Sequence, residues 1–258
     1  MKSAWMNFNK YRFLLGELVK KDIKLKYRRS YLGILWTLLE PLLTTAVLTL
    51  VFSNIMDKGG KTFPVYILTG RLLYTFFANA SKAAMKSIRS NGAMIKKVYV
   101  PKYIYPFSSV LSNFVIFLIS LIILFLASFV FQVMPTLYLL QIVVPLIMVL
   151  VLSMGVGMIL ATLAVFFRDL EYLWSVALML IMYTCGIFYY VDKLDLGKLS
   201  WIFNLNPLYL IIVNFRDAVF GNPMNREALI LSAVYSFGSL LIGILLFYKK
   251  QDDFILNI

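Results

Sequence analysis

A stretch of 65 residues, from Tyr103 to Phe167, contains no charged side chain. A helix needs about 20 apolar residues to cross the roughly 30 Å hydrocarbon core of a bilayer. The stretch is therefore long enough for two membrane-spanning helices. Turn-forming and polar residues near its middle, Gln132, Pro135 and Thr136, predict the place where the two helices are joined.

The composition agrees with a membrane protein. Hydrophobic residues make up 61% of the 258 residues, and only 14% are charged, whereas a soluble domain carries about 25% charged side chains. The net charge of +13 lies beside apolar runs, which favours anionic lipid or a lipid-linked phosphate over nucleic acid as a partner. The single cysteine, Cys185, excludes an internal disulfide, and without histidine a His-containing zinc site is impossible, so we expect no metal.

Other apolar runs bring the expected number of spans to six. We predict one all-α integral membrane domain over residues 1–258, with an amphipathic interfacial helix at 1–30 and a partly re-entrant external loop between the fifth and sixth spans. The predicted spans are 31–56, 63–81, 103–131, 137–167, 172–191 and 228–248, with a cytoplasmic coupling loop at 82–102 and an external gate loop at 192–226. An ordinary long external loop is the alternative for 192–226.

The N-terminal segment has the pattern of a helix that lies flat in the headgroup layer. Wound at about 100° per residue, positions 10–29 separate an apolar arc from a basic one. The apolar arc consists of Tyr11, Leu14, Leu15, Leu18, Val19, Ile23 and Leu25. A basic flank that only fixes topology is the alternative.

The distribution of lysine and arginine predicts the orientation. With both termini on the same side of six spans, that side receives eighteen basic residues and the other receives six. Because basic residues accumulate on the cytoplasmic side, we expect both termini in the cytoplasm.

Only two charged residues, Glu40 and Arg71, fall inside the predicted spans. Intramembrane charges are costly and often mark function, so both are candidates for a translocation pathway; structural pairing or snorkelling is the alternative. In the fourth span, Ser153, Gly157 and Ala161 recur every four residues, which predicts close helix packing.

No catalytic residues can be picked out. A membrane hydrolase or transferase needs a positioned acid, base, nucleophile or metal. The Gly60-Lys61-Thr62 sequence resembles the tail of a phosphate-binding loop, but Ile55 stands where that motif needs its first glycine. We therefore expect no cofactor on this chain, and if ATP is used, another chain binds it.

Five motifs in the same order resemble the permease subunits of ABC type-2 exporters of cell-surface polysaccharide, O-antigen and teichoic acid. The first motif comprises Tyr27, Arg28, Arg29, Ser30, Leu32, Gly33, Leu35, Trp36, Leu38, Leu39 and Pro41. The others are Gly70 to Phe77, Asn91 to Pro101, Phe167-Arg168-Asp169, and Asn206-Pro207 followed by Phe215-Arg216 and Gly221. Each motif is weak alone, but their shared order spans nearly the whole chain.

The resemblance implies a homodimer of six-span permeases, bound to two cytoplasmic ABC ATPase subunits that hold ATP and Mg²⁺. Its substrate would be a polyisoprenyl-pyrophosphate-linked polysaccharide or teichoic acid, moved from the cytoplasmic to the outer face of a bacterial inner or plasma membrane. The first and fifth spans would form a lateral gate for the lipid. The implied ATPase-coupling residues are Met85, Arg89, Asn91, Lys96, Lys97, Arg168, Asp169 and Glu171.

Two further groups of side chains suit such a substrate. Lys24, Lys26, Arg28 and Arg29 lie where a lipid pyrophosphate would travel, and each basic group near an anionic surface contributes on the order of 1 kcal/mol. Aromatic rings offer a sugar chain weak, repeated contacts along a pathway, with an interfacial aromatic belt as the alternative. These rings are Tyr66, Tyr74, Phe76, Phe77, Tyr183, Phe188, Tyr189, Tyr190 and Trp201.

Two other functions remain open at the level of sequence. An exporter of a smaller lipid or drug could share the fold and differ only in the width and lining of its pathway. A partner-free, membrane-bound glycan-processing enzyme would need clustered acids or a metal site, and the few charges in the spans argue against it.

Overall fold

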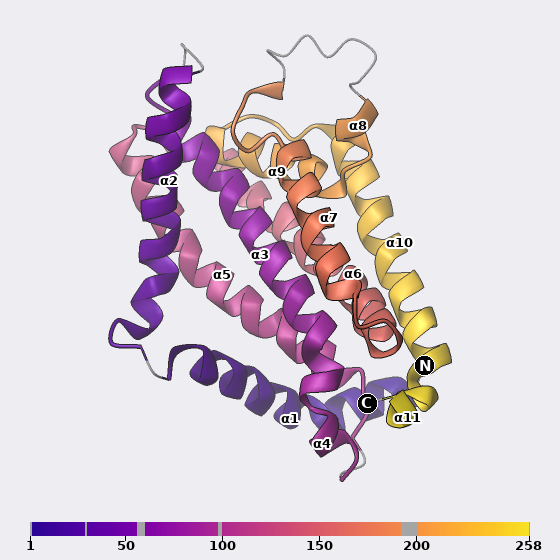
Figure 1. Cartoon of the computed structure of the whole chain (residues 1–258). Coiled ribbons are helices and arrows are strands. Elements are labelled where there is room, and N and C mark those ends of the chain that lie inside the picture. The colour runs from indigo at the N-terminus through magenta and orange to yellow at the C-terminus, as the bar shows by residue number, and fades with distance from the viewer. Residues whose placement is uncertain (1, 29, 56–59, 98–99, 192–200, 258) are drawn as a thin grey trace.

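The computed structural model describes residues 2–28, 30–55, 60–97, 100–191 and 201–257, and within these ranges every regular element is a helix (Figure 1). The longer helices are α1 (Lys2–Tyr27), α2 (Trp36–Ile55), α3 (Phe63–Ser90), α5 (Ile104–Val130), α6 (Val143–Phe166), α7 (Leu170–Thr184), α9 (Pro207–Phe220) and α10 (Arg226–Lys250). The short ones are η1 (Gly33–Leu35), α4 (Gly92–Ile95), η2 (Leu137–Ile142), α8 (Trp201–Asn204), η5 (Gln251–Asp253) and α11 (Phe254–Asn257). The predicted all-α class is confirmed.

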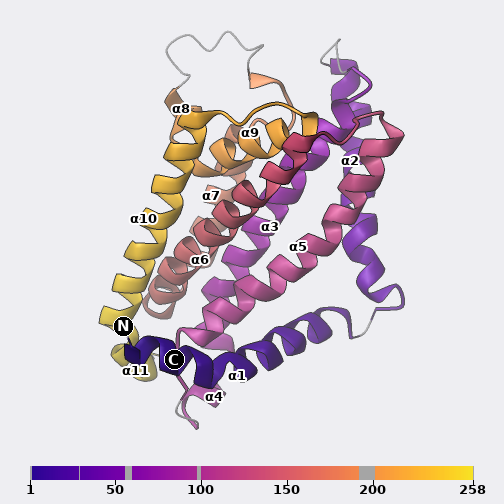
Figure 2. The same cartoon turned by 180° about the vertical axis from the view of Figure 1, so that it is seen from behind.

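The bundle has two distinct ends. One end, which we call the basic end, carries α1, α4, the connection between α6 and α7, and α11 (Figures 1 and 2). The other, which we call the distal end, carries α8, α9 and the connection between α5 and η2. Both ends of the chain lie at the basic end, and α2 and α10 stand at opposite sides of the bundle.

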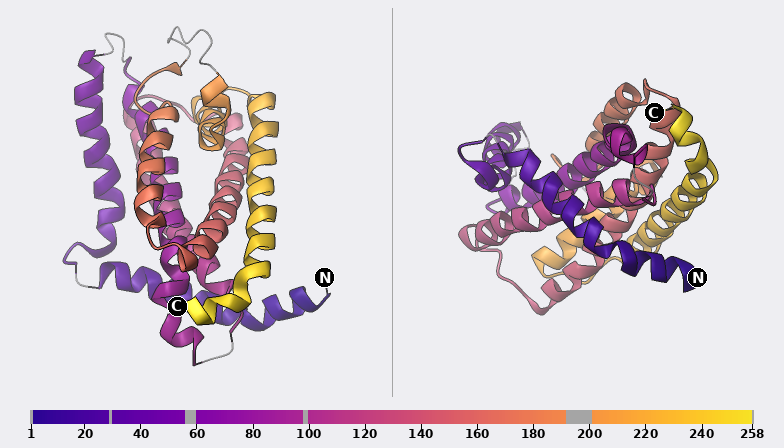
Figure 3. Two further views of the ribbon diagram at one scale, coloured as in Figure 1. Left: turned by 45° about the vertical axis from the view of Figure 1, so that its right-hand side comes forward. Right: turned by 90° about the horizontal axis from the view of Figure 1, so that it is seen from below.

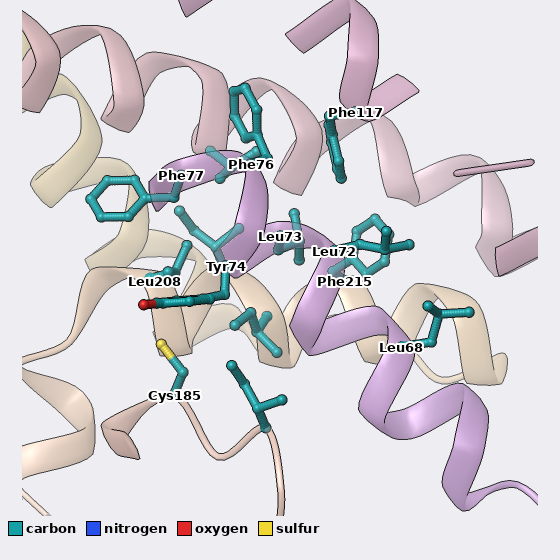
Figure 4. Packing of buried hydrophobic residues seen from close by; sticks show 14 of the residues in the cluster. Leu68, Leu72, Leu73, Tyr74, Phe76, Phe77, Phe117, Cys185, Leu208 and Phe215 are labelled. Atoms are coloured by element: carbon teal, nitrogen blue, oxygen red, sulfur yellow. The ribbon is translucent and has the colours of Figure 1, made fainter. Parts of the chain in front are cut away.

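Helix α3 forms the centre of the core. It buries 18 of its 28 residues and packs against α2, α5, α6 and α9. Phe76 of α3 stacks on Phe117 of α5 with ring centroids 5.0 Å apart, and Leu68, Leu72 and Leu73 lie in the same apolar cluster (Figure 4). The core is therefore built around the helix that also carries Arg71.

Four stretches in the described part of the chain are long and apolar enough to span a membrane: Gly33–Phe52, Ile104–Val130, Leu137–Phe166 and Arg226–Asp253. Six spans were expected. Helix α3 is long enough, but Arg71 and the basic residues of its last turns lower its hydropathy. Helix α7 has 15 residues, or about 22 Å of helix. Helix α3 also continues to Ser90, so it extends into the segment predicted as the coupling loop.

Helix α1 runs across the basic end of the bundle (Figure 3). Leu18 is buried, and Tyr11, Leu14 and Leu15 are half-buried against an apolar cluster that includes Phe254 of α11. Leu25, on the predicted apolar arc, is exposed. Part of the apolar arc therefore packs against the bundle, and part of it is exposed at the surface.

Helix α9 lies embedded at the distal end. The side chain of Asn206 caps it by accepting a hydrogen bond from the Leu208 N–H at 3.0 Å, and Pro207 occupies its first turn. It ends at Gly221, whose φ of 78° is the left-handed conformation that glycine adopts without strain. Nine of its 14 residues are buried, so this short helix packs within protein.

Candidate functional site

A cavity of about 380 Å³, with polar residues among apolar ones in its lining, lies between α2, α3, α5 and the end of α1. Its polar lining consists of Lys26, Ser30, Thr37, Glu40, Thr44, Arg71, Thr75, Asn79, Asn113 and Ser120. The Ser120 hydroxyl donates a hydrogen bond to the Thr37 carbonyl at 3.1 Å and so fastens α5 to α2. Such a concentration of hydroxyl, amide and charged groups among apolar helices can hold a hydrated or polar ligand.

The cavity brings together the two charges that the sequence placed inside spans. Glu40 and Arg71 both line it, and none of the ion pairs among the described residues joins them. The guanidinium of Arg71 instead has its Nη1 3.9 Å from the Met182 sulfur of α7. The two side chains therefore face the same space without neutralising each other directly.

Lys26, from the end of α1, adds a second positive charge to this cavity. Its side chain is exposed on one side, but partial loss of hydration lowers the pKa of its ammonium, while the nearby carboxylate of Glu40 acts in the opposite direction. The site thus combines two cationic groups with one carboxylate.

The polar lining continues toward α1. A neighbouring cavity of about 480 Å³ shares Lys26, Asn79 and Asn113 with the first and also contacts Asp22. Burial raises the pKa of the Asp22 carboxyl. Together the two cavities, which we call the α1 groove, lead from the basic end into the middle of the bundle.

Two other predicted gate residues, Lys24 and Arg28, do not line this groove. Lys24 is exposed on α1 and Arg28 is exposed just after the end of α1 at Tyr27, and Arg29 lies outside the described residues. Of the three described basic residues that the sequence assigned to the substrate pyrophosphate, Lys26 is the one that lines the α1 groove.

Four of the predicted aromatic residues, Tyr74, Phe76, Phe77 and Phe188, are buried in the core, and Phe76 also lines the α1 groove. Tyr74 donates a hydrogen bond from its hydroxyl to the Leu178 carbonyl at 2.9 Å and lies beside Leu208 and Cys185 (Figure 4). The rings of Tyr74, Phe77 and Phe188 pack within the protomer and do not line the α1 groove.

The remaining predicted aromatics lie at or toward the distal end. Tyr183 and Trp201 are exposed. Tyr66 is half-buried and donates hydrogen bonds to the carbonyls of Tyr189 at 2.9 Å and Gly186 at 3.2 Å, and its ring centroid lies 4.4 Å from that of Tyr190. The Tyr189 hydroxyl donates to the Tyr183 carbonyl.

The sequence did not predict the structural role of Arg216, which it counted among the basic residues of an external loop. Arg216 is only 7% exposed. Its Nη2 donates to the carbonyls of Gly186 at 3.0 Å and Tyr66 at 3.3 Å, and its Nε donates to the Thr69 hydroxyl at 3.4 Å. The guanidinium also lies 3.5 Å from the ring centroid of Tyr66. Arg216 therefore joins α9 to α3 and to the segment after α7.

Gly70 makes room for this arginine. A Cβ atom at position 70 would lie 2.8 Å from Arg216 Nη2. The motif that begins at Gly70 and the motif that contains Arg216 thus meet in space, although 146 residues separate them in sequence. The glycine at position 70 is the sequence feature that corresponds to the burial of Arg216. The sequence alone does not show that the two residues are in contact.

At the basic end, the two predicted coupling segments lie next to each other. The carboxylate of Glu171 at the start of α7 contacts Lys86 Nζ at 2.9 Å and Arg89 Nη1 at 3.5 Å, both on α3. Lys96, Lys97, Arg168 and Asp169 are exposed.

Two residues of the predicted coupling set have structural partners. Met85 is buried against Leu160 and Ala164 of α6. The Asn91 amide donates to the Ser87 carbonyl at 2.8 Å and its oxygen accepts from Lys21 of α1 at 3.3 Å.

Across the described ranges, no three Cys, Asp or Glu side chains come together as a metal site would require.

Comparison with known proteins decides the family. Residues 14–220 match the family model described as ABC-2 type transporter. The chain belongs to the ABC-2 type transporter family. This confirms the family that the five motifs indicated.

Relatives of this ABC-2 family chain match it over nearly its whole length. The O-antigen export system permease protein RfbA of Klebsiella pneumoniae is 32% identical over 245 residues, which cover 93% of each chain. A protein of the same name from Myxococcus xanthus is 27% identical and covers 95% of each. The polysialic acid transport protein KpsM of Escherichia coli is 22% identical over 96% of this chain and 98% of its own.

Proposed function

We propose that this permease exports a polyisoprenyl-pyrophosphate-linked polysaccharide, or a teichoic acid, from the cytoplasmic to the outer face of a bacterial inner or plasma membrane. The observation that carries the proposal is the α1 groove, which places Lys26, Glu40 and Arg71 along one polar route into the bundle. The export functions named for the RfbA and KpsM relatives support a glycan as cargo.

In the proposed arrangement α2, α3, α5, α6, α7 and α10 cross the membrane. Helix α3 has 28 residues, about 42 Å of helix, which is more than a bilayer core requires. The excess of basic residues supports a cytoplasmic position for the basic end. Helices α8 and α9 then form a partly re-entrant gate on the outer side, supported by the burial of α9.

The pyrophosphate of the lipid carrier would enter the α1 groove beside Lys26, because an ammonium attracts phosphate oxygens. The hydroxyl and amide side chains farther in would accept the first sugars, with Glu40 and Arg71 contacting polar substituents. The exposed rings of Tyr183 and Trp201 would contact the chain farther along. Tyr74, Phe77 and Phe188 act as core residues in this proposal.

Energy would come from two ATPase subunits bound to the basic end of a homodimer. The exposed Lys96, Lys97, Arg168 and Asp169 offer polar contacts for these subunits. Glu171, paired with Lys86 and Arg89, would make α3 and α7 respond together when ATP binds to the partner.

The test is the ATPase rate of the complex between this chain and the ATP-binding subunit encoded nearest to it, reconstituted in lipid. We expect a two-plus-two complex whose rate rises when the glycan-linked polyprenyl pyrophosphate is added. Polyprenyl phosphate without glycan serves as the control substrate. Failure to form a complex with any ATPase would refute the proposal, because the chain has no recognisable nucleotide site of its own.

Replacing Glu171 by glutamine should weaken the coupling of α3 to α7. The contacts are partly exposed, with the Lys86 side chain 58% and the Glu171 side chain 32% accessible, so the expected loss of stability is below about 1 kcal/mol. We expect the glycan-stimulated ATPase rate to fall several-fold while the basal rate and the melting temperature hold. Asp252→Asn, which neutralises an exposed carboxylate near the C-terminus, is the matched control, and equal effects in both variants would contradict the role of Glu171.

A further inference from the structure

A second polar cavity, of about 400 Å³, lies at the distal end between α9 and the start of α10. Three tyrosine rings line it: Tyr66 from α3, Tyr190 from the segment after α7, and Tyr209 from α9. Asparagine amides complete its rim. Its volume falls in the range of roughly 300–1,000 Å³ that is typical of small-molecule sites.

The charged residues of this cavity come from both helices. Arg216 and Asp217 belong to α9, and Glu227 belongs to the first turn of α10. The cavity thus contains two carboxylates and one guanidinium. This balance disfavours an anionic ligand, because a like charge brought near carboxylates is repelled.

One wall of the cavity is held rigidly. The Arg216 guanidinium is tied to two carbonyls and a hydroxyl and stacks on Tyr66, and the Tyr66 hydroxyl is bound to the Gly186 and Tyr189 carbonyls. A ligand that meets this wall does not have to order it first. Preorganisation of this kind lowers the cost of binding.

Arg216 covers one face of Tyr66, but the rings of Tyr190 and Tyr209 lie beside carboxylates and amides in an arrangement that suits carbohydrate. The apolar C–H face of a pyranose ring packs on an aromatic ring, and carboxylate and amide oxygens accept hydrogen bonds from sugar hydroxyls. We propose that this cavity, the α9–α10 site, binds one or two neutral sugar residues of the exported chain. The inference rests on the proposed export function and adds a second, outer contact for the same substrate, where it would retain the emerging glycan between ATP cycles.

The test uses saturation-transfer NMR to detect the binding of oligosaccharides of two to four residues to the purified chain in lipid nanodiscs. The oligosaccharides are released by mild acid from the surface polysaccharide of the cells that produce this chain, and a sialic-acid tetramer is the anionic comparison. We expect saturation of the neutral sugar protons only. Asp217→Asn and Glu227→Gln should each weaken binding about tenfold, as loss of a charged hydrogen-bond acceptor does.

Asp252→Asn removes a carboxylate at the basic end and should leave the affinity unchanged. Glu227 is exposed, so Glu227→Gln keeps the test valid if Asp217→Asn fails to fold. Absence of saccharide binding, equal loss in Asp252→Asn, or stronger binding of the sialic-acid tetramer would overturn the proposal. Glycerophosphoethanolamine serves as a soluble lipid-headgroup probe in the same measurement. Saturation of its protons in place of the sugar protons would assign the cavity to lipid headgroups and would also overturn the proposal.

The two proposals can fail separately. A complex whose ATPase is stimulated by the glycan lipid, but whose α9–α10 site binds no saccharide, refutes the outer site and leaves export intact. A chain that forms no ATPase complex refutes the proposed function, whatever the NMR titration gives.

Discussion

Replacing Arg216 by lysine is expected to abolish glycan-stimulated ATPase activity and to lower the stability of the folded state by about 3 kcal/mol. The planar guanidinium contacts Gly186, Tyr66 and Thr69 at once, besides stacking on the Tyr66 ring. An ammonium has neither the fork geometry nor the flat face needed for this set. The substitution would leave buried polar groups without their donors and would release α9 from α3.

Thermal unfolding of the purified chain in nanodiscs, followed together with the ATPase rate of the complex, checks this expectation. Arg226→Lys is the matched control, because Arg226 is exposed at the start of α10. A melting temperature within about 2 °C of the parent chain for Arg216→Lys would show that the buried contacts of Arg216 contribute little. If Arg226→Lys also lost activity, the loss in Arg216→Lys could not be attributed to the buried contacts of Arg216.

The sequence could not predict the role of Arg216 because most of its hydrogen-bond acceptors are not side chains. Two of its acceptors are backbone carbonyls, contributed by positions 66 and 186, and any residue type provides a carbonyl. Hydropathy and charge counts treat a basic residue between two spans as solvated. Only the placement of α9 within the bundle reveals that Arg216 is buried.

The candidate pathway was partly predictable. Glu40 and Arg71 could be selected from the sequence because any charge inside an apolar run is conspicuous. Their convergence on one cavity depends on how α2 and α3 are rotated and tilted, which depth along each span does not determine. The same limit applies to aromatic rings: Tyr74 and Tyr183 have the same chemistry, yet one is buried and the other exposed.

The overall architecture was easier to predict than the site. Membrane-length apolar runs report directly on helices, since every backbone polar group in lipid must be paired within its own segment. The amphipathic pattern of the N-terminal segment likewise matches a helix across the basic end. The amphipathic pattern did not predict that Leu18 is buried against the bundle while Leu25 is exposed, because both residues lie on the same arc.

Replacing Gly155 by valine should separate α6 from α10 and destabilise the protein by about 3 kcal/mol. A Cβ at position 155 would lie 2.4 Å from the Leu240 backbone nitrogen and 2.5 Å from the Ser239 carbonyl carbon. Backbone atoms cannot turn aside as a flexible side chain can, so α10 itself would have to move. The contact is reciprocal, since a Cβ at Gly243 would lie 2.6 Å from the Gly155 oxygen.

Gly238 of α10 is the matched control for this prediction, because no neighbouring atom lies within 4 Å of a Cβ built there. Gly238→Val should shift the melting temperature in nanodiscs by only a small amount, while Gly155→Ala should already lower it and Gly155→Val should lower it further. The stripe of Ser153, Gly157 and Ala161 lies beside this contact, and Gly157 approaches Ala84 of α3, with a built Cβ 2.9 Å from the Ala84 Cβ. Equal melting temperatures for Gly155→Val and Gly238→Val would mean that α6 and α10 do not pack through Gly155. A graded loss confined to position 155 would identify the close backbone approach at Gly155 and Gly243 as the contact that holds α6 against α10.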